Sequence, residues 1–131
     1  MSGETYVLNA DAGRVLAPEK QPAVEMARVE GMNFSYGVLA DLPDAGVTFA
    51  RGVVPPGKEV PAHAGPNLYA LLVLSGTGRL TLFDDAQRPT GALDFAPGTL
   101  VVFPPGAQHG WINDSDADFV WFGVDLPDRS G

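Results

Sequence analysis

Residues 98–113 read GTLVVFPPGAQHGWIN, and this stretch decides the fold. Proline fixes the backbone φ angle and glycine accepts conformations that other residues avoid, so Pro104 and Gly106 predict a tight turn. The apolar segments on either side of the turn favour strands. The turn would then aim His109 at the start of the second strand. We expect Asn113, at the far end, to bond to backbone groups in a turn rather than to act as a ligand.

Turn-forming residues also divide the rest of the chain into short segments. Its 16 glycines and 12 prolines are scattered at intervals, which is typical of turns between short elements. The intervening segments alternate or are continuously apolar, as strands do. The clearest examples are MNFSYGVL (32–39), VTFARGVV (47–54), NLYALLVLSG (67–76) and GRLTLFDD (78–85). About nine or ten short strands of this spacing predict an all-β sandwich or barrel.

One segment has a weak helical pattern. Residues 18–29 read PEKQPAVEMARV, where the prolines argue against a regular helix. We expect irregular structure or a strand there. The N-terminal residues 1–30 have no obvious place in a minimal barrel and suit an arm in dimer contact, with residues 31–131 forming the barrel itself.

The composition excludes several classes of function. With 131 residues the chain fits one domain, and its 45% apolar content is that of a globular protein. It has no cysteine, so thiolate chemistry and disulfides are excluded. A net charge of −8 argues against nucleic acid or an anionic membrane surface as partner. No apolar run is long enough to span a membrane, and the beginning MSGETYVLNAD lacks the features of a secretory signal, which together favour a cytoplasmic location.

The opening stretch resembles the second motif of the cupin superfamily at every fixed position. In this sequence the motif reads Gly98-x5-Pro104-x-Gly106-x2-His109-x3-Asn113. Upstream, residues 55–78 read PPGKEVPAHAGPNLYALLVLSGTG and resemble the first cupin motif. There five residues separate Gly57 from His63, and Gly76 closes the motif. The resemblance implies a single-domain cupin, a jelly-roll barrel (double-stranded β-helix) of two antiparallel sheets.

The first motif departs from the family pattern at two positions. The pattern has a second histidine where this chain has Gly65, and a glutamate where it has Tyr69. A typical cupin holds a divalent metal ion with three histidines and one carboxylate. Only His63 and His109 remain of those four ligands, and they are the only two histidines of the chain. The resemblance therefore implies the fold, while the implied metal site is reduced.

The resemblance also implies which side chains share a pocket. The family's ligand positions point into the barrel, so His63, Tyr69 and His109 are the expected catalytic residues. Because alternate side chains of a strand share a face, Asn67 should point inward too. Further wall residues are expected, although their faces depend on strand register: Tyr36, Phe49, Arg51, Trp111 and Trp121. Of these, Arg51 is the cation that could hold an anionic substrate, with Asn67, Tyr36 and Trp111 as further substrate contacts.

Three functions remain open for such a pocket. The first is a metal-free enzyme in which the histidines and the Tyr69 phenol move protons, in isomerase, epimerase, cyclase or lyase chemistry. The second is a metalloenzyme of dioxygenase or lyase type, in which His63 and His109 bind Fe, Mn, Ni, Cu or Zn. The third is a non-catalytic cup for a small molecule. We favour an enzyme acting on a small molecule, in a homodimer, because open strand edges would otherwise be a liability.

Overall fold

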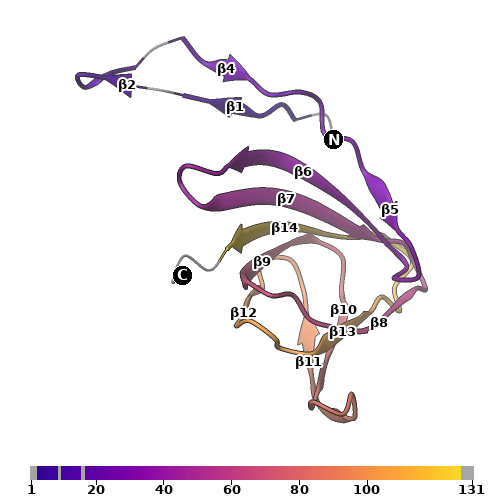
Figure 1. Cartoon of the computed structure of the whole chain (residues 1–131). Coiled ribbons are helices and arrows are strands. Elements are labelled where there is room, and N and C mark those ends of the chain that lie inside the picture. Colours follow the sequence, from indigo (N-terminus) through magenta and orange to yellow (C-terminus); the bar gives the residue numbers. More distant parts are fainter. Residues whose placement is uncertain (1–2, 9, 16, 128–131) are drawn as a thin grey trace.

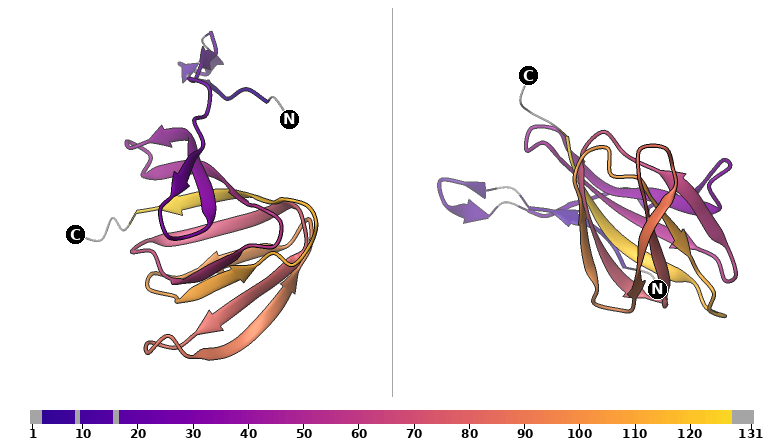
Figure 2. Two further views of the ribbon diagram at one scale, coloured as in Figure 1. Left: turned by 90° about the vertical axis from the view of Figure 1, so that its right-hand side faces the viewer. Right: turned by 90° about the horizontal axis from the view of Figure 1, so that it is seen from below.

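The computed structural model describes residues 3–8, 10–15 and 17–127. Two antiparallel sheets curl toward each other and enclose the core (Figures 1 and 2). The larger sheet has the spatial order β12 (Leu100–Phe103), β9 (Leu68–Ser75), β14 (Phe119–Leu126), β7 (Val47–Val54), β6 (Phe34–Leu42) and β5 (Ala27–Val29). The smaller sheet has the order β11 (Pro89–Phe95), β10 (Gly78–Phe83), β13 (His109–Ile112) and β8 (Glu59–His63). The all-β jelly-roll prediction is confirmed.

The N-terminal segment forms two small strand pairs outside these sheets. β1 (Tyr6–Val7) pairs with β4 (Glu19–Lys20), and β2 (Ala10–Asp11) pairs with β3 (Arg14–Val15). These pairs lie beyond the outer side of β6 and project away from the barrel (Figures 1 and 2). Within 18–29 the chain forms the strands β4 and β5, as expected. None of the described residues forms a helix, so none provides a helix long and apolar enough to cross a membrane.

Alternation along the central strands builds the core. On β7 the residues Ala50, Gly52 and Val54 are buried, whereas the residues between them face outward and are half-buried. β14 follows the same rule, with Phe119 and Trp121 turned inward. The core is a single cluster between the two sheets, as expected for a jelly roll. Its buried members are Val54, Val60, Leu71, Val73, Leu80, Phe95, Phe103, Trp111, Phe119 and Trp121.

The turn between β12 and β13 has the geometry that the sequence predicts. Gly106 has a φ of 79°, in the left-handed region where glycine carries no Cβ penalty. The Ala107 amide donates to the Pro104 carbonyl oxygen at 3.2 Å and closes the turn. The Gly106 amide donates to the Gly65 carbonyl oxygen at 2.9 Å. The turn of the second motif is thereby fastened to the chain that follows β8.

Asn113 fastens the other end of the second motif. Its side chain is fully buried, and its Nδ2 donates to the carbonyl oxygens of Val54, Pro55 and Ala117. Its Oδ1 accepts bonds from the Ser115 amide and hydroxyl. The amide therefore ties the end of β7 to the loop before β14. The expectation that Asn113 bonds to backbone groups is confirmed.

Candidate functional site in the barrel

A cavity of ≈ 160 Å³ lies between the two sheets. Its walls come from the first and second motifs and from the inner faces of β6 and β14. The lining residues are Phe34, Tyr36, His63, Gly65, Pro66, Asn67, Tyr69, Leu71, Phe103, Pro104, Ala107, His109, Trp111, Trp121 and Asp125. The set is mostly aromatic and aliphatic, with a few polar groups among them. Such a composition is typical of small-molecule sites.

His63 and His109 are neighbours across two strands. They are directly paired residues of β8 and β13, and their ring centroids lie 4.5 Å apart. His109 stacks on Phe103 at 4.0 Å, and the His63 ring lies over Phe34 at 6.2 Å. Aromatic rings on the outer side of each imidazole therefore hold the pair in place. Two residues 46 positions apart in the sequence thus form one group.

A hydrogen bond of the same kind, from the ring to a backbone carbonyl oxygen, determines which nitrogen of each histidine carries the proton. Nδ1 of His63 donates to the Pro61 carbonyl oxygen at 2.9 Å, and Nδ1 of His109 donates to the Ala107 carbonyl oxygen at 2.8 Å. A carbonyl oxygen only accepts, so Nδ1 must carry the hydrogen in both rings. In the neutral imidazole this leaves Nε2 with a free lone pair. Both histidines therefore offer Nε2 as a base or a ligand.

His109 is held in its neutral form. Its pKa is lowered to about 4, mainly because the ring is buried; the hydrogen bond to Ala107 opposes this shift, and the nearby His63 adds to it. A charged imidazole is disfavoured there because the side chain is removed from water among apolar rings. At neutral pH the Nε2 of His109 is consequently an unprotonated base.

Tyr69 is a phenol at the same cavity. Its Oη accepts a hydrogen bond from Nε1 of Trp121 at 2.9 Å. Burial raises the pKa of Tyr69, and the neighbouring Tyr36 raises it further. Burial also raises the pKa of Tyr36. Both residues therefore keep their hydroxyl protons at neutral pH, and a hydrogen bond joins the two hydroxyl groups, which a ligand oxygen could replace.

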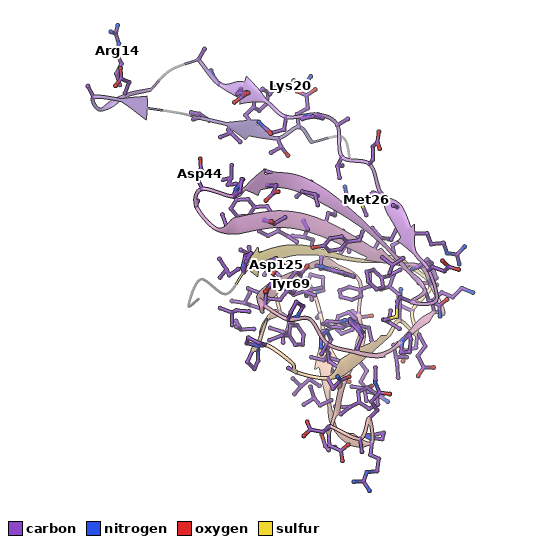
Figure 3. The ribbon with its side chains drawn as sticks, viewed as in Figure 1. Arg14, Lys20, Met26, Asp44, Tyr69 and Asp125 are labelled. Atoms are coloured by element: carbon purple, nitrogen blue, oxygen red, sulfur yellow. The ribbon has the colours of Figure 1, made fainter. Side chains whose placement is uncertain are left out.

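Two glycines make room for this aromatic pair. A Cβ at Gly123 would overlap the Tyr69 hydroxyl, and a Cβ at Gly52 would overlap the Trp121 indole. The two rings therefore lie directly on the backbone of the larger sheet. Asp125 pairs with Tyr69 across β14 and β9 and lies beside it near the end of β14 (Figure 3). The hydrogen-bonded Tyr69–Trp121 pair is thus built from several strands of the larger sheet.

These observations allow comparison with known proteins. A family model described as the cupin domain matches residues 50–125, which is more than half of the chain. The chain belongs to the cupin family. This cupin is 36% identical over 73 residues to a gentisate 1,2-dioxygenase from Aquipseudomonas alcaligenes. That match covers 55% of this chain but only 20% of the dioxygenase, so the chain spans about a fifth of that relative.

Solved structures with the same fold are more distant in sequence. The cupin domain of Cnp3 from Schizosaccharomyces pombe superposes with a TM-score of 0.70 at 14% identity, covering 95% of this chain and 88% of that one. The polyketide cyclase RemF from Streptomyces resistomycificus gives a TM-score of 0.63 at 22% identity, covering 82% of this chain and 77% of that one. At these identities the likeness establishes the fold alone.

Most residues expected at the site line the cavity of this cupin. Those that do are His63, His109, Tyr69, Tyr36, Asn67, Trp111 and Trp121. Two expectations are wrong, because Arg51 and Phe49 do not line this cavity. On β7 the inward positions are Ala50 and Gly52, so their neighbours face the outer side of the sheet. Phe49 stacks there on Phe122 at 6.0 Å, and Arg51 lines a different groove.

Three of the lining residues that the sequence did not predict are important for the site. Phe34 and Phe103 supply the rings behind the two histidines, and Asp125 supplies a carboxylate beside Tyr69. A signal for Asp125 was present, since it lies four residues after Trp121 and therefore on the same face of the strand. Phe34 shares a face with Tyr36 by the same rule.

The donor set of this cupin does not fit the usual metal site of the family. Among the described residues there is no group of three or more His, Asp or Glu side chains that could hold a metal ion. Gly65 has no side chain, and a Cβ built there would meet open space. The phenol at Tyr69 cannot easily replace the glutamate, because burial opposes its ionisation. The imidazoles of His63 and His109 would therefore have to bind a metal ion without an anionic ligand.

The charge of the cavity restricts its ligands. Among its described lining residues the ionisable groups are the two histidines, the two tyrosines and Asp125, and none is lysine or arginine. With His109 neutral, no permanent cation is present to compensate a buried carboxylate or phosphate. The lining therefore favours an uncharged, largely apolar ligand over an anionic one.

Proposed function

We propose that this cupin is a small-molecule enzyme that transfers protons on an uncharged, enolisable carbonyl compound. The observation that carries the proposal is a neutral His109, its Nε2 free, in an apolar cavity without a permanent cation. A base of this kind removes a proton from the carbon next to a carbonyl group. Isomerases, epimerases, cyclases and lyases all use this step.

Each polar group of the cavity has a proposed part in the reaction. Nε2 of His109 accepts the proton and, as the imidazolium, gives it back at another atom of the same ligand, either directly or through Nε2 of His63, whose ring centroid lies 4.5 Å away. The Tyr69 hydroxyl donates a hydrogen bond to the carbonyl oxygen, where negative charge develops. Tyr36, Asn67 and Trp111 bind the body of the substrate. A polyketide cyclase is among the proteins that share this fold, so the fold is compatible with cyclase chemistry.

Deuterium exchange tests the proposal without knowledge of the natural substrate. 2-Tetralone is a flat, uncharged ketone with acidic C–H bonds, and NMR in D₂O reports the loss of its α-protons. We expect the protein to accelerate this exchange, and His109→Ala and His63→Ala to lose the acceleration. Arg79→Gln, on the exposed side of the smaller sheet, is the control and should exchange like the wild type. Equal rates with the wild type and with both histidine variants would refute the proposal.

A metal-dependent function is the alternative that one observation favours. Both imidazoles present a free Nε2, and Gly65 leaves space next to them for an ion and its waters. Fe, Mn, Ni, Cu and Zn are the candidates, with dioxygenase or lyase chemistry. Metal analysis of protein purified without an affinity tag separates the two functions. If the wild type holds stoichiometric metal and both histidine variants lose it, the metal-dependent function replaces the proton-transfer proposal. If the protein binds the ketone tightly but neither accelerates its deuterium exchange nor holds metal, the cavity is a non-catalytic binding site.

We also propose that the protein acts as a cytoplasmic homodimer. The outer face of β9 and β12 supports the dimer, since Leu74, Leu100 and Val102 are 50%, 62% and 54% exposed there. A sheet face of this apolarity is typical of an interaction surface. The N-terminal arm, residues 1–30, is proposed to contact the second copy, because Tyr6 and Leu8 are also exposed.

A further inference from the structure

A second groove lies on the outer side of the larger sheet, away from the barrel cavity. It is enclosed between the N-terminal arm and the strands β6 and β7, and its volume is ≈ 640 Å³. Figure 1 shows the arm arching over this side of β6. The lining residues are Gly3, Glu4, Thr5, Lys20, Gln21, Pro22, Ala23, Val24, Leu39 and Arg51. It shares no residue with the lining of the barrel cavity.

Arg51 is the residue of this groove that needs explanation. It is half-buried, and its Nε is buried without a hydrogen-bond partner. No carboxylate of the described residues forms an ion pair with its guanidinium. A guanidinium carries its charge throughout the physiological pH range. Burying part of it without a counter-charge therefore lowers the stability of the folded protein. An oxyanion in the groove would compensate it.

The neighbours of Arg51 explain why its charge is not met within the chain. In register it lies between Gly37 of β6 and Phe122 of β14, and neither offers a side-chain acceptor. Gly37 is covered by the arm, since a Cβ there would meet the side chains of Val24 and Met26. The arm therefore closes over this part of the sheet with Val24, Met26 and the Glu25 backbone carbonyl, and no carboxylate of the described residues lies within ion-pair distance of the guanidinium.

The charges and walls of the groove indicate the class of ligand. Lys20 and Glu4 form an ion pair at 3.0 Å and largely cancel each other, and both are exposed. The remaining charge is the single positive charge of Arg51. Pro22, Ala23, Val24 and Leu39 supply an apolar wall, and Thr5 and Gln21 supply uncharged polar groups. A single uncompensated guanidinium beside an apolar wall matches a monoanionic carboxylate with an apolar tail better than a free phosphate, whose charge is higher.

We propose that the groove between the N-terminal arm and the larger sheet binds an organic monocarboxylate with an apolar body, and that Arg51 holds its carboxylate. The carboxylate accepts hydrogen bonds from the guanidinium, and the tail lies along the arm. The ligand then contacts both the arm and the sheet, so its binding fastens the arm to the barrel. This site is separate from the proposed catalytic cavity.

Calorimetric titration of the full-length protein with octanoate tests the proposal. We expect one octanoate per chain, and Arg51→Gln should weaken the binding by about tenfold or more, as removal of a charged hydrogen-bonding partner does. Arg51→Lys keeps the charge and should bind with intermediate affinity. Arg79→Gln is the matched control, because this arginine is also on a strand but lies outside the groove, and it should leave the dissociation constant unchanged.

Further probes separate the groove from the barrel cavity and from other ligands. Octanol has the same tail without charge and should bind no better to wild type than to Arg51→Gln. Inorganic phosphate should bind weakly or not at all. His109→Phe obstructs the barrel cavity and should leave octanoate binding intact. An NMR spectrum of the arginine Nε–H groups gives a reading that needs no variant, since the Arg51 signal should shift on addition of octanoate.

Several results would overturn the proposal. Equal octanoate affinity in wild type and Arg51→Gln would remove Arg51 from the site. Loss of binding in His109→Phe alone would place octanoate in the barrel. Phosphate binding as tight as octanoate would contradict the apolar body. If Arg51→Gln changed only the molecular mass in solution, a carboxylate of a second copy would be the partner of Arg51, and the groove would not be a ligand site.

Discussion

At the scale of single residues, the site depends on two histidines whose protons are placed by the backbone. Each ring donates its Nδ1 hydrogen to the carbonyl oxygen two residues earlier in the chain, at Pro61 and at Ala107. This contact comes from local strand geometry and needs no other side chain. The sequence motifs predicted both histidines, but not the tautomer, which depends on where those carbonyl groups point.

The depressed pKa of His109 predicts a pH effect on stability. The folded protein binds the His109 proton with a pKa of about 4, and the unfolded chain with the ordinary 6.5. Between these values the unfolded state binds more protons, so acidification lowers the free energy of unfolding, by about 3 kcal/mol in total. His109→Phe keeps an aromatic ring on Phe103 and should remove this part of the pH dependence. Urea denaturation of both proteins from pH 7 to 4 measures the difference; parallel curves would contradict the burial of a neutral imidazole.

The Tyr69–Trp121 hydrogen bond predicts an energetic coupling. Tyr69→Phe removes the hydroxyl that accepts from the buried Trp121 Nε1, and an unpaired buried N–H costs about 1–3 kcal/mol. Trp121→Phe removes the donor as well as part of the ring. The double variant should therefore be less destabilised than the sum of the single ones. Chemical denaturation of the four proteins measures this coupling, and strict additivity would show that the bond contributes nothing.

At the scale of elements, the turns were predictable and the strand register was not. Pro104 and Gly106 marked the turn of the second motif, because their conformational preferences are local. The direction in which Arg51 points was not predictable, since the sequence VTFARGVV offers apolar residues at both parities. The contact between Tyr69 and Trp121 joins β9 to β14. The pairing of strands so far apart in the sequence depends on the register of the whole sheet, so this contact was not predictable either.

The glycines beneath the aromatic pair predict a local packing effect. Gly123→Ala places a methyl group where the Tyr69 hydroxyl lies, and this buried ring is held in place by its hydrogen bond to Trp121. We expect a loss of about 1–3 kcal/mol in stability, as for overpacked cores, together with weaker ligand binding. Gly91→Ala is the matched control on another strand, where a Cβ meets only one methyl carbon at ordinary contact distance, 3.9 Å. Equal destabilisation by both substitutions would contradict this account of the sheet.

The hydrogen bonds of Asn113 join the elements around it, so its substitution should lower the free energy of unfolding. Asn113→Ala leaves the carbonyl oxygens of Val54, Pro55 and Ala117 without their shared donor. Because the side chain is fully buried, we expect a loss of about 2–4 kcal/mol in the free energy of unfolding. Asn33→Gly should cost much less, because Asn33 is exposed, makes one bond to the Glu59 carbonyl oxygen and has a φ of 60° that glycine also adopts. Thermal denaturation of both variants checks this, and similar shifts in Tm would contradict it.

At the scale of the whole molecule, the exposed apolar face predicts the state of assembly. Leu100→Glu together with Val102→Glu introduces charges on the outer face of β12, where burial in a dimer would be costly. Light scattering should then give half the molecular mass of the wild type. Leu93→Glu is the control, since Leu93 is 51% exposed on the smaller sheet. A wild-type protein that is already monomeric, or a double variant that stays dimeric, would contradict the proposed interface.

The whole molecule combines a fold that two motifs predict with a site that departs from those motifs. The barrel follows from strand alternation and turn residues, whereas the chemistry follows from the loss of two ligand positions at Gly65 and Tyr69. What remains is a histidine pair in an apolar, cation-free cavity. His109 is neutral in this pair, and both rings donate their Nδ1 hydrogen to a backbone carbonyl oxygen and offer Nε2 to a ligand.

The measurement that tests this claim most directly is an NMR titration of the imidazole nitrogens. The chain has only two histidines, so His63→Ala assigns the signals of both. The account predicts that at neutral pH His109 is the neutral Nδ1–H tautomer, with an unprotonated Nε2, and that its pKa is about 4. An Nε2–H tautomer would remove the proposed base, and a His109 pKa at or above the ordinary 6.5 would contradict the burial of a neutral imidazole.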